Sequence, residues 1–280
     1  MMTTKPFEDT SLLSLNQYTT HRWSVAEAAE ACARAGLRYI GLWRDKVAEA
    51  GLSASARICR ENGLSVSSLC RGGMFPAGTE SARREKIADN RRAVDECAEL
   101  RCDTLVLVCG GMAGCPVDEA RKMVRDGIAA ITDYASSRGV RLGIEPLHPM
   151  FAADRSVINT LGQALDLAEE IGAAGLGVII DVYHVWWDPG LFAQIERARG
   201  RIFGFHVSDW LVPPPDTLLG RGMMGDGVID IRRIRGAVQA TGYAGPIECE
   251  VFNRRIWDTP GSDVLELMKQ RFLERCLSVF

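Results

Sequence analysis

Short apolar runs alternate along this chain with longer stretches rich in alanine and charged residues. There are eight such runs, and a segment of helical composition follows each one. Strands that alternate with helices of this length predict βαβ units and a parallel sheet. Runs without polar alternation are typical of strands buried on both faces. The runs are residues 11–16 (SLLSLN), 39–43 (YIGLW), 65–70 (SVSSLC), 104–109 (TLVLVC), 141–145 (RLGIE), 177–181 (GVIID), 202–207 (IFGFHV) and 246–251 (PIECEV).

Two of the helical segments carry recognisable end signals. Ser24 precedes the stretch VAEAAEACARA and Gly36 follows it, while Ser81 opens SARREKIADNRRAVDECAEL. Serine is a favourable N-cap, and glycine commonly follows the last helical residue. We therefore expect helices that are capped at Ser24 and at Ser81.

Eight β/α units predict an α/β fold, a (β/α)₈ TIM barrel, as a single domain over residues 1–280. Barrels of this type need about 250 residues. No linker or low-complexity tract divides the chain. The alternative is an open doubly wound sheet, but no G-x-G-x-x-G turn follows the first run.

Composition narrows the range of partners. The apolar share is 47%, the charged share 25% and the net charge -3, so there is no electrostatic reason to expect nucleic acid or a membrane. No apolar run reaches the roughly 18 residues of a membrane span. The first ten residues lack signal-peptide features, and the nine cysteines form no C-x-x-C pair. We expect a cytoplasmic protein with reduced cysteines.

Acidic and imidazole side chains stand at the ends of four consecutive runs. Glu145 ends the fifth, Asp181 ends the sixth, His206 lies near the end of the seventh, and Glu248 and Glu250 lie in the eighth. In a barrel these ends meet at the C-terminal mouth, where active sites lie. Clustered carboxylates repel one another unless a cation compensates them. Any one of them alone would fit a structural salt bridge, but four on consecutive strands favour one metal site.

The eighth run offers two glutamates for that site. Glu248 and Glu250 face the same way because side chains alternate along a strand, and Glu250 is nearer the mouth. Glu250 is therefore the expected ligand. Glu248 is expected one layer deeper, with an arginine or lysine as a candidate partner.

The segments GIEPLHP, IIDVYH, GFHVSDW and GYAGPIECEVF, in this order, resemble the sugar phosphate isomerase/epimerase superfamily of xylose isomerase-like TIM barrels (AP endonuclease 2-like). The ketose 3-epimerase-like members are closest in motif. The resemblance implies that the strand-end residues named above, with Glu250 from the last strand, bind the metal. It also places His184, in D-x-x-H, and Arg221, in RGMMGDG, at the substrate.

The sequence departs from the epimerase pattern in two places, and both concern the substrate. Leu147, His148 and Pro149 stand where an asparagine-containing segment is usual, and the segment 208–220 is longer than expected. We include His148 among the candidate substrate contacts. The substrate within the carbohydrate class is left open.

Other residues at strand ends are weaker candidates. Trp43 ends the second run, Arg44 follows it directly and Arg71 directly follows the third, so each could reach a sugar hydroxyl or a carboxylate. Trp186 and Trp187 could wall the pocket or pack against a second subunit. Asp209 could fix its loop or orient His206.

Three carboxylates and one imidazole form a hard donor set, which suits a single manganese, magnesium or cobalt ion. Such a site favours abstraction of a proton beside a carbonyl by Glu145 or Glu250, through a metal-stabilised enediolate. The predicted function is isomerisation or epimerisation of a keto-sugar or a related polyol ketone. The expected partner is a small carbohydrate, and a homo-oligomer is allowed.

Three alternatives fit part of the pattern. A lyase or deglycosidase could use the same first step for β-elimination from 3-keto-glycosides, with room for an aglycone beside the long 208–220 segment. A non-catalytic barrel would not need the four ligands. An endonuclease IV-like enzyme would need a trinuclear zinc site rich in histidine, whereas this chain has four histidines and a mildly acidic charge.

Overall fold

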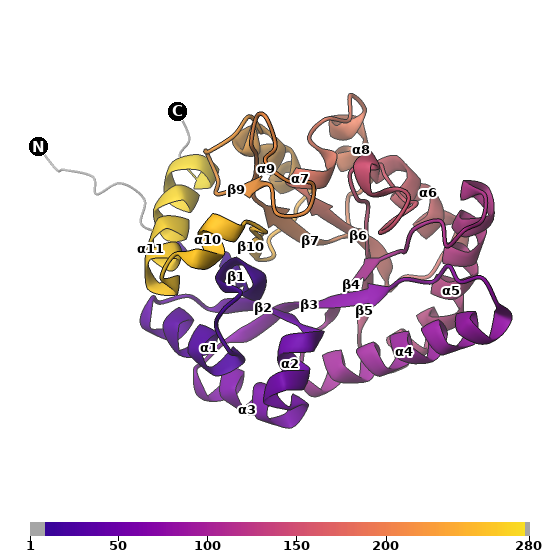
Figure 1. The fold of residues 1–280 in the computed structure, drawn as a ribbon, viewed down its shortest axis with the longest axis horizontal. Coiled ribbons are helices and arrows are strands. Elements are labelled where there is room, and N and C mark those ends of the chain that lie inside the picture. Colours follow the sequence, from indigo (N-terminus) through magenta and orange to yellow (C-terminus); the bar gives the residue numbers. More distant parts are fainter. Residues whose placement is uncertain (1–8, 278–280) are drawn as a thin grey trace, which may run out of the picture.

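The computed structural model describes residues 9–277. In it, eight parallel strands close into a barrel in the order β1-β10-β7-β6-β5-β4-β3-β2, which confirms the (β/α)₈ prediction and excludes the open sheet (Figure 1). Each of the eight predicted runs contributes one barrel strand. The strands are β1 (Leu13–Asn16), β2 (Tyr39–Trp43), β3 (Ser65–Gly73), β4 (Thr104–Val108), β5 (Arg141–Glu145), β6 (Leu176–Asp181), β7 (Ile202–Val207) and β10 (Ile247–Cys249).

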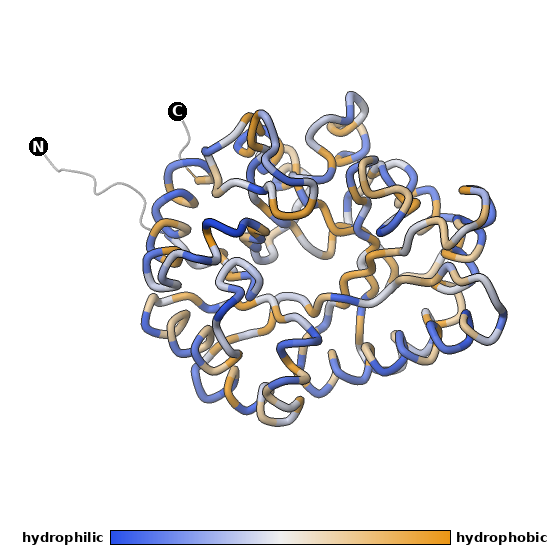
Figure 2. The backbone as a smooth tube through the Cα atoms, in the orientation of Figure 1, coloured by the Kyte–Doolittle hydropathy of each residue, from blue (hydrophilic) through white to orange (hydrophobic). Residues whose placement is uncertain are grey.

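Helices surround the barrel and cover its outer face, and hydrophilic residues are frequent along these helices (Figure 2). The α-helices are α1 (Val25–Arg34), α2 (Arg44–Ala50), α3 (Leu52–Glu61), α4 (Glu80–Glu99), α5 (Val117–Ser137), α6 (Leu161–Ile171), α7 (Val182–Val185), α8 (Leu191–Arg197), α9 (Ile231–Ala240), α10 (Arg254–Asp258) and α11 (Gly261–Phe272). The short elements are the 3₁₀ helices η1 (Gln17–Thr20) and η2 (Pro149–Phe151), the π-helix η3 (Leu273–Leu277), and the two-stranded ladder of β8 (Asp209–Trp210) with β9 (Arg221–Gly222).

One of the two predicted helix caps is correct. Ser24 caps α1 in a full capping box with Glu27, an arrangement that contributes about 1 kcal/mol. Gly36 follows with φ +75°, the left-handed conformation that glycine adopts without strain. The cap at Ser81 is wrong. Thr79 caps α4 instead, because its backbone is extended and its side chain accepts a hydrogen bond from the Ala82 amide.

The prediction of reduced cysteines agrees with the structure. All nine are free, and all but Cys115 are buried. Burial raises the pKa of the Cys109 thiol and of the Cys32 thiol well above the usual range, so both stay protonated and behave as apolar core residues. No helix among residues 9–277 is long and apolar enough to cross a membrane.

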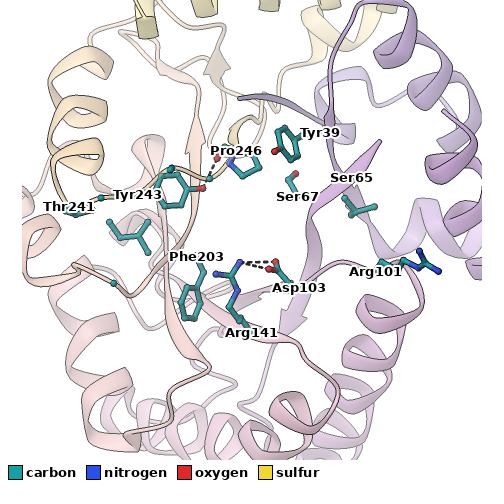
Figure 3. Close-up of a pocket in the computed structure, with 16 residues that line it drawn as sticks. Tyr39, Ser65, Ser67, Arg101, Asp103, Arg141, Phe203, Thr241, Tyr243 and Pro246 are labelled. Carbon is teal, nitrogen blue, oxygen red and sulfur yellow. Dashed lines mark hydrogen bonds and ion pairs between the residues drawn. The ribbon is translucent and has the colours of Figure 1, made fainter. Parts of the chain in front are cut away.

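A cavity of about 550 Å³ lies at the N-terminal end of the strands, opposite the predicted site (Figure 3). Its wall includes Tyr39, Arg141, Phe203 and Tyr243. Arg141 pairs with Asp103 at 2.9 Å and lies over the Phe203 ring, so its charge is already partnered. The predicted strand-end residues lie at the other end of the barrel.

Candidate metal centre

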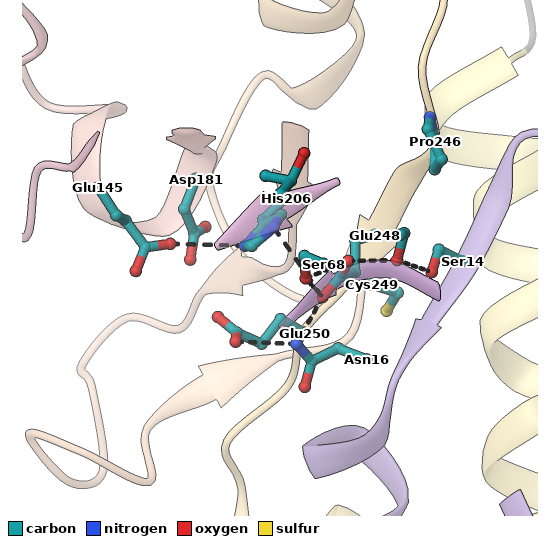
Figure 4. A network of polar contacts seen from close by, with 12 residues as sticks. Ser14, Asn16, Ser68, Glu145, Asp181, His206, Pro246, Glu248, Cys249 and Glu250 are labelled. Carbon is teal, nitrogen blue, oxygen red and sulfur yellow. Dashed lines mark hydrogen bonds and ion pairs between the residues drawn. The ribbon is translucent and has the colours of Figure 1, made fainter. Parts of the chain in front are cut away.

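Four buried side chains from consecutive strands meet at the C-terminal mouth of the barrel. One ligand atom from each of Glu145, Asp181, His206 and Glu250 lies within 4.8 Å of the other three (Figure 4). Each of the four is at most 5% exposed. The strand register brings them to one height, since Asp181 on β6 is paired with His206 on β7.

The donors in this cluster are poorly satisfied within the protein itself. Oε1 of Glu145 and both ring nitrogens of His206 are buried without a hydrogen-bond partner among residues 9–277. Nδ1 of His206 lies 3.4 Å from Oε1 of Glu145, but this contact lacks hydrogen-bond geometry. Buried polar atoms without partners are costly, so a bound cation would complete this donor set. The cluster therefore fits a metal site.

The charges of the cluster shift the pKa values of its members. Burial disfavours a charged His206, but Glu248, Glu145 and Glu250 outweigh it and raise the pKa of the imidazole to about 10. Burial raises the pKa of Glu250 to about 8, although Arg221 opposes this shift. Without a cation, both groups hold a proton at neutral pH.

Glu248 lies below the cluster, as predicted, but the expectation of an arginine or lysine beside it is wrong. Its carboxylate accepts hydrogen bonds from Asn16 Nδ2 at 2.7 Å and from Ser68 Oγ at 2.9 Å (Figure 4). It also accepts one from Ser67 Oγ at 2.7 Å. His206 Nε2 is 3.9 Å away. Three neutral donors and one imidazole thus surround this carboxylate where an arginine or lysine was expected.

Asn16 and Gly41 are residues of the centre that sequence reasoning missed. Asn16 ends β1 and donates to both Glu248 Oε1 and Glu250 Oε1, at 2.7 and 3.0 Å. A Cβ on Gly41 would lie 2.1 Å from Oε1 of Glu248, so only glycine leaves space for that carboxylate. Asn16 could have been found by the strand-end rule, because it is the last polar residue of the first apolar run.

Arg221 and His184 both lie at the cluster. Arg221, on β9, contacts Asp181 Oδ2 and Glu250 Oε2 at 2.8 Å each and is sandwiched between the rings of Tyr183 and Phe252. Burial lowers the pKa of its guanidinium, but Asp181 and Glu250 outweigh burial and raise it. Arg221 was predicted to contact the substrate and not the metal. In the structure its guanidinium also bonds directly to two of the predicted metal ligands, Asp181 and Glu250.

His184, on α7, lies behind Arg221. Burial lowers the pKa of its imidazole to about 3, so the ring is neutral. The backbone N–H of His148 lies 3.2 Å from Nδ1. Nε2 lies 3.0 Å from Nη2 of Arg221, and because a guanidinium can only donate, Nε2 accepts this hydrogen bond.

A cavity of about 270 Å³ opens directly above the cluster. Its wall contains Trp43, Arg71, His184 and Arg221 among the predicted residues. Trp43 both packs and faces the cavity, because its Nε1 donates to Asn16 Oδ1 at 3.0 Å while its ring lies on Tyr18. Residues not foreseen complete the wall: Tyr18, Cys70, Val108, Leu147, Phe151, Arg155, Leu218, Phe252 and Trp257.

Several candidates lie outside this cavity wall. The His148 ring packs between Trp187 and Trp210. Arg44 points to the outer helices, where it pairs with Asp89 at 3.0 Å and with Glu96, so its suggested sugar contact is wrong.

The remaining two candidates have packing or loop roles. Trp186 packs against Trp210. Asp209 fixes its own loop by accepting from the amides of Trp210, Gly225 and Ile229.

Three comparisons place this chain among known proteins. A protein of Sinorhizobium meliloti 1021, SMc04130, has a crystal structure that superposes with a TM-score of 0.94 at 50% identity, covering 96% of this chain and 100% of that one. The 3-dehydroshikimate dehydratase of Pseudomonas aeruginosa is 34% identical over 185 residues, 62% of this chain. The match spans only 28% of the length of that dehydratase.

A third relative is similar over most of both chains. The L-ribulose-5-phosphate 3-epimerase UlaE of Salmonella paratyphi A is 25% identical over 215 residues, covering 73% of this chain and 70% of the epimerase. The family model described as xylose isomerase-like TIM barrel matches residues 29–276. With the closed barrel and the cluster at its mouth, this match shows that the chain belongs to the xylose isomerase-like TIM barrel family.

Proposed function

We propose that this protein is a divalent-metal-dependent isomerase or epimerase that abstracts a proton beside the carbonyl of a keto-sugar or a related polyol ketone. The observation that carries the proposal is the cluster of Glu145, Asp181, His206 and Glu250 under a cavity of substrate size. A divalent ion held there, manganese, magnesium or cobalt by its oxygen-rich donors, would polarise the carbonyl and stabilise the negative charge that develops.

The residues that line the cavity have distinct roles in this reaction. Glu145 and Glu250 both line the cavity, so either carboxylate is placed to take the α-proton while the C–H electron pair moves toward the carbonyl oxygen. The other carboxylate, or the same one, returns a proton to the same carbon for epimerisation or to its neighbour for isomerisation. His184 and Arg221 offer polar contacts from the cavity wall, and the rings of Trp43 and Phe252 give an apolar wall for a sugar face.

Elimination of water is the second candidate function. The relative of highest identity among the enzymes described above is named a 3-dehydroshikimate dehydratase. Dehydration shares the first step, removal of a proton beside a carbonyl, and differs only in loss of a β-hydroxyl afterwards. The 3-keto-glycoside lyase is not favoured, because the enzyme relatives described above are named for dehydration and epimerisation.

The test is solvent exchange during turnover. Metal-loaded protein is incubated in D₂O with L-ribulose 5-phosphate, an inosose and 3-dehydroshikimate, and deuterium at the α-carbon is followed by NMR. With L-ribulose 5-phosphate or the inosose, proton abstraction predicts deuterium in the product or in recovered substrate, and loss of this exchange with a chelator. Complete conversion of either ketose without any deuterium would indicate a hydride shift and contradict the proposed step. With 3-dehydroshikimate, loss of water from the substrate is the readout, because elimination returns no hydrogen to the α-carbon. A noncatalytic barrel would give neither exchange nor conversion.

A further inference from the structure

Two arginines in the wall of the mouth cavity have no acidic partner inside it. Arg71 lies near the end of β3 and Arg155 follows η2, and both line the cavity together with Glu145. Arg71 makes no hydrogen bond or ion pair with any residue of the range 9–277. Arg155 is paired only loosely among those residues, at 3.7 Å from Asp154, a side chain that is 65% exposed. Two positive charges thus face the cavity with little compensation.

Other arginines near the mouth show how unusual this is. Arg44, one residue after β2, is fully engaged by Asp89 and Glu96. Arg221 is neutralised by Asp181 and Glu250. A guanidinium that is partly buried without a carboxylate gives up hydration and gains no ion pair, which is unfavourable unless a ligand supplies the anion.

The charged groups of the metal centre do not compensate the charges of Arg71 and Arg155. The three ligand carboxylates are matched by a divalent ion together with Arg221, so once loaded they leave no charge over to pair with Arg71 or Arg155. Burial lowers the pKa of Arg71, and the nearby charge of Arg155 lowers it further. Both arginines line the same cavity of about 270 Å³, so one anion bound in it would compensate both charges.

We propose that Arg71 and Arg155 form a subsite for an anionic group of the substrate, a carboxylate or a phosphate. This rests on the proposed function, because it assumes that the carbonyl end of the same molecule lies at the metal centre. The substrate class is then an acidic polyol ketone, such as a ring carboxylic acid or a sugar phosphate, and not a neutral sugar. The planar guanidinium group suits both oxyanions through paired hydrogen bonds.

The experiment compares ligands that differ only in the anionic group. The affinity of manganese-loaded protein is measured by calorimetry for 3,4-dihydroxybenzoate against catechol, and for L-ribulose 5-phosphate against L-ribulose. The variants are Arg71→Gln and Arg155→Gln, with Arg71→Lys to retain charge. Arg34→Gln is the matched control, because Arg34 lies on α1 with a side chain that is 72% exposed. Metal content is measured in each protein.

We expect the charged member of at least one pair to bind more tightly than its neutral partner. In Arg71→Gln and Arg155→Gln that affinity should fall about ten- to hundredfold, the loss expected for one charge-assisted hydrogen bond, while the neutral member is unaffected. Arg71→Lys should retain part of the preference, and Arg34→Gln all of it. The pair that shows the effect identifies the anion as carboxylate or phosphate.

Equal affinity within both pairs, or an equal loss for charged and neutral members in the Arg71 and Arg155 variants, would overturn the subsite. So would a failure of both charged ligands to bind. The chemical proposal fails separately: charge-selective binding without α-deuterium exchange keeps the subsite and removes the reaction. Exchange of neutral ketoses without charge selectivity keeps the reaction and removes the subsite.

Discussion

The substitution Glu248→Gln tests whether Glu248, the deeper glutamate, has a different role from Glu250, the glutamate at the mouth. The substitution keeps the shape of the side chain and removes its charge. Three donor groups now bond to the carboxylate, those of Asn16, Ser67 and Ser68. A hydrogen bond to a charged group stabilises by about 1.5–3 kcal/mol and a neutral one by about 0.5–1.5 kcal/mol. The loss is therefore about 1 kcal/mol per donor, or roughly 3 kcal/mol in all.

That loss is a large part of the roughly 5–15 kcal/mol that stabilises a typical domain. Urea unfolding of the metal-free protein should show a clearly lower midpoint for Glu248→Gln, while plasma emission shows that the ion still binds. The paired variant, Glu250→Gln, should instead lose the ion and the solvent exchange together, because it removes a ligand. If Glu248→Gln empties the site while Glu250→Gln leaves it full, the assignment on the eighth strand is wrong.

Three further predictions follow from the same contacts. Binding of a divalent ion at pH 7 should release roughly two protons, one from His206 and one from Glu250, whose pKa values are raised to about 10 and about 8, so affinity should fall as pH is lowered. Calorimetry in buffers of different ionisation enthalpy measures this release, and a heat independent of buffer would refute it. Arg221→Gln should tighten divalent-ion binding by roughly tenfold and slow turnover, because the guanidinium competes for oxygens of Asp181 and Glu250; weaker ion binding would contradict this competition. Gly41→Ala should lower stability by about 1–3 kcal/mol, because its Cβ would collide with Glu248, and an unchanged urea midpoint would show that the carboxylate can move aside.

The fold and the metal cluster were largely determined by the sequence. Eight apolar runs that alternate with helical segments are compatible with few folds. Closure into a barrel then brings the C-terminal ends of the strands to one mouth. Glu145, Asp181 and His206 could be placed there because strand ends can be recognised from local pattern alone. Alternation points Glu248 and Glu250 the same way, and the position of Glu250 nearer the mouth then distinguished it from Glu248.

The partners of these residues were decided by the tertiary structure. Ser67 and Asn16 are separated from Glu248 by 181 and 232 positions in the chain, and no local pattern indicates that they meet. Arg221 was expected beside the substrate, but only the β8–β9 ladder brings its guanidinium against two ligand carboxylates. His148, by contrast, has its ring between two tryptophans and outside the cavity wall. Strand ends follow from local hydrophobic pattern, whereas the contacts of a buried polar group depend on which distant backbones the closed barrel brings within hydrogen-bond reach.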